Sequence, residues 1–341
     1  GTSRSHNSSA RTCCAFRRCA QNIWLHKEEG RFQMVNIGDI INAGLFAAAL
    51  RMATPLIFAS IGGLFSERVG VVNIALEGMM LTGAFAGVLA TFAIGNPWIG
   101  VLASILAGGL LGFIHAVLTV KFAGNQIVSG TGINLLALGA TGYLSQAIWG
   151  SRGASQPVQG IDAVSIPLLK DVPFLGDVIG TQTPIVYLSI LTVILSYILL
   201  FKTPIGLRLR AVGEHPEAAD TAGVNVYKTK YLFLILSGML AGLGGAFLSL
   251  AHLNLFVLGM TGGRGFIALA AMILGGWNPV GALGASFLFG FADAFQMRLQ
   301  SVAALPSQII LTLPYILTIV VLAVFARKRM PPSDYKPYTK E

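Results

Sequence analysis

The sequence has little charge, and it has no cysteine beyond its first part. Only 11% of its 341 residues are charged, whereas soluble domains carry about 25%. The three cysteines are Cys13, Cys14 and Cys19. We therefore expect no disulfide or cysteine-ligated metal framework in the rest of the chain. The low charge argues against a soluble globular protein.

Motifs for chemistry are also missing from the sequence. It contains no Gly-x4-Gly-Lys-Ser/Thr phosphate loop, and its five histidines form no His-Glu-x-x-His or other metal-ligand spacing. His115 and His252 each lie alone in an apolar run, where we expect a hydrogen-bonded packing role. We expect a protein that is not an enzyme, with no ATPase site of its own, no cofactor and no metal.

Long apolar runs dominate what is present. Apolar residues make up 54% of the chain, and the mean hydropathy is +0.72. Runs of about 20 apolar residues are long enough to cross a bilayer as helices, and their continuity argues against a barrel. The sequence predicts an all-α polytopic transmembrane helical bundle with about eight to ten segments. These run over 41–64, 71–94, 98–120, 127–149, 184–201, 231–256, 266–277, 280–295 and 307–326.

The net charge is +9, and the basic residues lie at the ends of the apolar runs, as they do in the cytoplasmic loops of membrane proteins. We therefore expect the chain to contact lipid and not nucleic acid. By the distribution of Lys and Arg, loop 202–230 faces the cytoplasm and the loop 150–183 faces outside. The transmembrane domain covers 34–330, and 331–341 form a cytoplasmic tail. Counting the membrane-crossing segments back from loop 202–230 places the N-terminus outside. The N-terminus is inside if the interrupted stretch 71–81 enters the membrane without crossing it.

Residues 1–33 differ from the rest, because they contain six basic residues and no long apolar run. We interpret them as a leader upstream of a misassigned start, with the native protein beginning at Met34. The alternatives are a disordered extension or an Arg- and Ser-rich transit peptide.

Glu77 is the most informative ionisable residue within the apolar runs, because a charge at a helix centre costs about 2.5–3.5 kcal/mol. Asn73 lies four residues before it, so on a helix the two side chains share a face. They either line a substrate pathway or hold helices together by a hydrogen bond or an ion pair. Glu77 and Asp293 also keep open an ion-coupled secondary transporter, which is the alternative function.

A second polar group consists of Asn125, Gln126, Ser129 and Asn134. Hydrogen-bonding amides suit an uncharged polar substrate such as a nucleoside or a sugar. The same groups also commonly link helices to one another in membranes. We assign these four residues, together with Asn73 and Glu77, as candidates for the substrate pathway.

Loop 202–230 is a charged island with five Lys or Arg residues and three acidic ones. Its stretch Glu217-Ala-Ala-Asp-Thr-Ala-Gly223 resembles the cytoplasmic coupling segment of ABC importer permeases. The surrounding motifs are similar to the branched-chain amino acid and simple-sugar permease group. They lie at 206–214, 237–246 and 271–282, and the stretch 67–84 is closest to nucleoside-type permeases.

This resemblance implies a permease subunit of an ATP-driven importer, which forms a pathway for nucleosides or simple sugars in the bacterial plasma membrane. It implies three partners: a separate ATPase subunit, a second permease subunit, identical or related, and an extracytoplasmic substrate-binding lipoprotein. The residues that the resemblance assigns to ATPase coupling are Glu214, Glu217, Ala218, Ala219, Asp220 and Gly223.

Overall fold

The computed structural model describes residues 42–165 and 175–302, together with five isolated positions between 312 and 323. Its helices are α3 (Ala43–Arg68), α4 (Leu76–Ile94), α5 (Pro97–Ala116), η1 (Val117–Lys121), α6 (Gln126–Trp149), α8 (Leu175–Ile179), α9 (Pro184–Lys202), α10 (Pro204–Glu214), α11 (Pro216–Thr221), α12 (Val226–Ala246), η2 (Phe247–His252), α13 (Arg264–Leu274) and α14 (Pro279–Val302). The strands β1 (Val164–Ser165) and β2 (Thr181–Gln182) pair antiparallel.

Asparagine is the N-cap residue of four of the long helices. The side chains of Asn42, Asn96, Asn125 and Asn225 each accept a hydrogen bond from a backbone N–H in the first turn of α3, α5, α6 and α12. A short polar side chain at this position satisfies one of the donors that a helix start leaves open. These caps mark the helix boundaries that apolar runs alone do not define.

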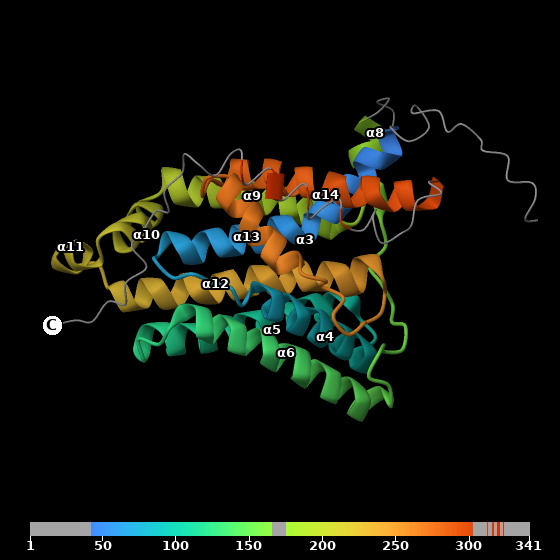
Figure 1. The fold of residues 1–341 in the computed structure, drawn as a ribbon, viewed down its shortest axis with the longest axis horizontal. Coiled ribbons are helices and arrows are strands. Elements are labelled where there is room, and N and C mark those ends of the chain that lie inside the picture. Colours follow the sequence, from blue (N-terminus) through green and yellow to red (C-terminus); the bar gives the residue numbers. More distant parts are fainter. Residues whose placement is uncertain are drawn as a thin grey trace, which may run out of the picture. The chain divides into compact units, whose positions relative to one another are not determined.

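The helices α3 and α12 lie at the centre of the bundle. α12 contacts α3, α4 and α5, and α3 also packs against α13 and α14 (Figure 1). The helices α6 and α9 lie at the periphery and expose many large apolar side chains. In a bilayer such side chains face lipid or another helix without cost.

Glycines bring α5 and α12 close together. A Cβ atom on Gly108 would lie 2.2 Å from the carbonyl oxygen of Gly238, and one on Gly242 would lie 2.3 Å from that of Ser104. No other residue fits such a backbone approach, which is how membrane helices gain packing energy without a hydrophobic driving force. The high glycine content of the sequence therefore serves this interface.

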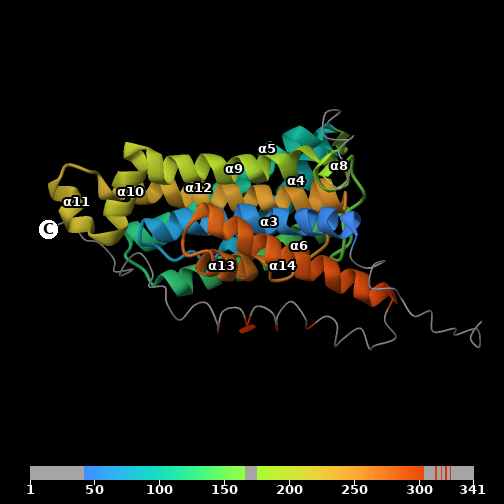
Figure 2. The ribbon, with the colours of Figure 1, turned by 90° about the horizontal axis from the view of Figure 1, so that it is seen from above.

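The helices α10 and α11 form one end of the bundle, as both views show (Figures 1 and 2). At the other end, segment 153–161 runs along segment 250–258. The N–H groups of Ser155, Val158 and Ile161 donate to the carbonyls of Phe256, Asn254 and Leu250. This strap holds in place the loop that leads to α13.

The all-α prediction is confirmed. Within the described residues, seven helices are long and apolar enough to cross a membrane, and α13 is a shorter apolar helix. The first of these seven, α3, begins at the end opposite to α10 and α11, because its last residue, Arg68, lies against Gly213 of α10. The expected leader 1–33, the tail 331–341 and most of the segment 307–326 lie outside the described residues.

Candidate functional site

A break between α3 and α4 is the centre of the polar site. Residues 69–75 are not helical, and Asn73 is fully buried among them. Side chains from α5 and α6 satisfy this backbone. Gln126 Oε1 accepts from Val72 N at 2.7 Å, and His115 Nε2 lies 3.2 Å from Val72 O. Non-helical backbone at membrane depth requires such internal partners.

Asn73 and Asn134 also stabilise the non-helical backbone of residues 69–75. Asn73 Nδ2 donates to Ser237 Oγ on α12 at 2.9 Å. Asn134 Oδ1 accepts from Gly78 N at 2.7 Å, while its Nδ2 donates to Ile74 O at 3.0 Å. Asn134 therefore clamps the backbone on both sides of the first residues of α4.

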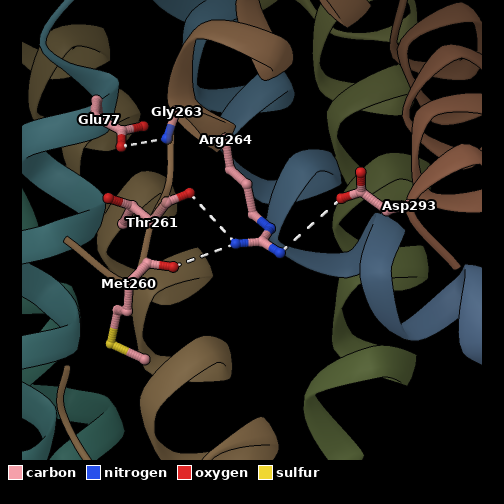
Figure 3. Close-up of polar contacts among 6 residues, drawn as sticks. All are labelled: Glu77, Met260, Thr261, Gly263, Arg264 and Asp293. Carbon is pink, nitrogen blue, oxygen red and sulfur yellow. Dashed lines mark hydrogen bonds and ion pairs between the residues drawn. The ribbon is translucent and has the colours of Figure 1, made fainter. Parts of the chain in front are cut away.

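Glu77 joins the start of α4 to the start of α13. Its Oε1 accepts from Gly263 N at 2.8 Å, as Figure 3 shows. Its Oε2 accepts from Gly265 N at 2.7 Å. Both donors belong to the first turn of α13, where backbone N–H groups lack partners within the helix. A carboxylate at this end also complements the helix dipole. Glu77 thus fastens two helix starts to each other.

This junction lies deep in the membrane-spanning region. At 1.5 Å per residue, the 11 residues of α13 span about 16 Å. Its C-terminal end is followed by Trp277, whose carbonyl accepts from Arg68 Nη2 at 2.7 Å, close to α10. The start of α13 therefore lies up to about 16 Å from the α10 end, a distance that falls within a hydrocarbon core of about 30 Å.

Arg264, the first residue of α13, is a polar group that the sequence reasoning missed. Its Nη2 lies 4.0 Å from Asp293 Oδ2 on α14, and its Nη1 donates to the carbonyls of Met260 and Thr261 (Figure 3). A basic residue between the glycine pair 262–263 and an apolar run was the available signal. Asp293 alone was recognised there, without its partner.

The structure brings five of the six pathway candidates together around the break. Ser129 joins the group through His115, whose Nδ1 lies 3.0 Å from Ser129 Oγ. Asn125 lies apart, because it is exposed and its oxygen caps α6. The expectation that Asn73 and Glu77 share a helix face is wrong, since α4 begins only at Leu76.

The two histidines differ from each other. The packing role expected for His115 is confirmed by its hydrogen bonds to Ser129 and Val72. The same expectation is wrong for His252, which is exposed at the end of η2 and stacks on Phe247.

The proposed coupling residues form an exposed turn and short helix. Glu214, Glu217 and Ala218 are exposed, whereas Ala219 is buried against Val212 and Val226. The other two positions, Asp220 and Gly223, lie at the end of α11, where Gly223 N donates to Asp220 O at 2.9 Å. Gly223 has φ +83, a left-handed conformation that favours glycine at a helix end.

The coupling segment rests directly on the bundle. A Cβ atom on Gly213 would lie 2.1 Å from Arg68 O, so the end of α10 touches the end of α3. Arg68 binds the carbonyl of Trp277, and the Trp277 indole donates to Glu67 Oε2. These contacts connect α10 to α3 and to the turn between α13 and α14.

The fold defines the class as a multi-pass α-helical membrane protein. The chain belongs to the family described as branched-chain amino acid transport system / permease component, which matches residues 45–322. The resemblance drawn from the sequence motifs is thereby confirmed.

Three relatives are themselves ABC transporter permease proteins. The guanosine permease protein NupQ of Bacillus subtilis is 43% identical over 86% of this chain and 95% of its own length. The nucleoside permease protein NupC of Lactococcus lactis is 41% identical over 88% of this chain and 96% of its own. The guanosine permease protein NupP of the same Bacillus is 27% identical over 80% and 78%. This chain is therefore an ABC permease, and the alternative of an ion-coupled carrier is not supported.

Proposed function

We propose that this chain forms the translocation pathway for nucleosides in an ATP-driven importer of the bacterial plasma membrane. The support for the substrate class is the identity above 40% to a guanosine and a nucleoside permease protein, over nearly their whole lengths. The amides of Asn73, which is buried, and of Gln126 and Asn134, which are half-buried, suit a pathway for uncharged polar solutes. Each of them also forms a hydrogen bond within the protein.

The exposed α10–α11 segment is the main support for coupling to a separate ATPase subunit. Glu214, Glu217 and Ala218 are exposed there, while Gly213 contacts the end of α3 through backbone atoms. A separate ATPase subunit that docks on this surface would push on α3 directly, with no flexible linker in between. In this proposal ATP hydrolysis occurs in that partner, because the sequence contains no Gly-x4-Gly-Lys-Ser/Thr phosphate loop.

Two further partners complete the importer. A second permease subunit would pair with this one, and the two guanosine permease proteins of Bacillus subtilis, 43% and 27% identical to this chain, favour a related but non-identical partner. An extracytoplasmic binding lipoprotein would deliver the substrate to the face that carries loop 150–183.

A reconstituted uptake assay tests this function. The chain would be assembled in proteoliposomes with its ATPase, the second permease and the binding protein, and supplied with labelled guanosine, adenosine or ribose. We expect nucleoside uptake that requires ATP and every component. An ATPase variant that cannot hydrolyse ATP is the control. Uptake by this chain alone, driven by an ion gradient, would overturn the proposal.

A further inference from the structure

The pair of Arg264 and Asp293 is open rather than closed. The separation of 4.0 Å between Nη2 and Oδ2 exceeds a hydrogen bond. The two side chains are 20% and 15% exposed, although they lie within the membrane-spanning region. Figure 3 shows the guanidinium extended from the start of α13 toward α14.

One edge of this guanidinium is held by backbone carbonyls, and the other edge has no hydrogen-bond partner among the described residues. Nη1 donates to the carbonyls of Met260 at 3.2 Å and Thr261 at 3.4 Å. Nε is buried and has no hydrogen-bond partner among the described residues. Nε and Nη2 are neighbours on one side of the planar group, so they present two parallel donors to a ligand with two adjacent acceptors. A buried donor without an acceptor costs free energy, so we expect a ligand to supply an acceptor to this edge.

The surroundings place this edge on a polar face. Arg51 of α3 and His252 of η2 are both exposed, and His252 lies within electrostatic range of Arg51 and Arg264. Ionisable side chains within a membrane span face a bundle interior or a water-filled cavity, because contact with lipid is unfavourable. Arg51, His252 and Arg264 therefore form a group of ionisable side chains on this side of the bundle.

We propose that Arg264 selects 6-oxopurine nucleosides by donating from Nε and Nη2 to N7 and O6 of the base. This inference rests on the proposed nucleoside transport. Guanine presents these two acceptors side by side and binds arginine bidentately, whereas adenine presents a donor in place of O6. Asp293 is a positioning residue, since its charge holds Nη2 in the plane that faces the base.

The test compares guanosine with 7-deazaguanosine, in which a C–H group replaces N7. ATP-driven uptake of both would be measured for the wild type and for Arg264→Lys in the complete reconstituted importer. Lysine keeps the charge but has no planar pair of donors. We expect the variant to lose about 10-fold of the wild-type preference for guanosine, which is the scale of one bidentate contact. The binding protein is the same in both, so its own selectivity cancels in the comparison.

Arg152→Lys is the matched control, because Arg152 is exposed in the outer loop; we expect its preference to equal that of the wild type. If Arg264→Lys does not assemble, the double variant Arg264→Gln/Asp293→Asn removes both charges together, and we expect the same loss of preference. An unchanged ratio in the variant that assembles overturns this inference alone. Absence of nucleoside uptake by the wild type would overturn the proposed function as well.

Discussion

Glu77 and Glu217 are carboxylates in contrasting regions of the molecule. Glu77 is half-buried at the junction of α4 and α13, where both of its oxygens accept from backbone N–H groups. Glu217 lies in the first turn of α11 and is exposed. The polar groups of the junction form hydrogen bonds within the protein, whereas Glu217 is exposed at the surface.

This difference separates two ways in which a polar residue serves a transporter. At membrane depth an unsatisfied polar group costs several kcal/mol, so Glu77, Asn73 and Asn134 first serve to hold a non-helical backbone. At the exposed surface of α11 water satisfies the polar groups, so we expect that Glu217 is not required for the fold. Thermal unfolding of the purified protein, measured beside uptake, distinguishes these roles. The four variants below follow in order of their expected effect on stability.

Glu77→Ala should have the largest effect. It removes two hydrogen bonds to a charged group, each of which contributes about 1.5–3 kcal/mol, and leaves the start of α13 uncapped. We expect a large loss of folded protein together with a loss of uptake. Asp162→Ala, at an exposed acid of the outer segment, is the control. A normally stable Glu77→Ala protein with altered uptake would show that the carboxylate acts on the substrate and is not needed for the junction.

Asn134→Ala should rank second. It leaves Gly78 N and Ile74 O without their side-chain partner, at a cost of about 1–3 kcal/mol for each buried group. Asn125→Ala is the matched comparison on the same helix, because it removes only an exposed cap worth about 1 kcal/mol. Equal unfolding temperatures for the two variants would contradict the clamp that we assign to Asn134.

Gly213→Ala should follow, with a loss of about 1–3 kcal/mol from overpacking against Arg68. We also expect reduced ATP-driven uptake, because the added methyl group separates α10 from α3. Gly132→Ala on α6 is the control, since a Cβ atom there meets nothing within 4 Å. Uptake that is unaffected in Gly213→Ala would argue against force transmission through this contact.

Glu217→Arg should have the smallest effect on stability and a complete effect on transport. Exposed substitutions usually change stability by less than about 0.5 kcal/mol. A reversed charge on the docking surface should prevent productive contact with the ATPase, so we expect folded protein without uptake. Co-purification of the ATPase and uptake would both be measured, and unchanged uptake would remove Glu217 from the coupling surface.

Much of the fold was predictable, because apolar runs of about 20 residues have one stable form in a bilayer. The approximate positions of α5, α6, α9 and α14 follow from those runs. The break at 69–75 was less predictable. Asn73 interrupts an otherwise apolar stretch, but whether the backbone there is helical depends on Gln126, His115 and Ser237, which lie far away in the sequence.

By itself, the sequence determined the membrane class of this protein, the approximate positions of most of its apolar segments, and the family to which its motifs belong. Those properties depend on local composition and short motifs. Only the tertiary structure decided that Glu77 caps α13, that Gly213 touches Arg68 and that Arg264 faces Asp293. Each of these contacts joins residues more than 25 positions apart, and its existence depends on how the helices pack and not on any local pattern.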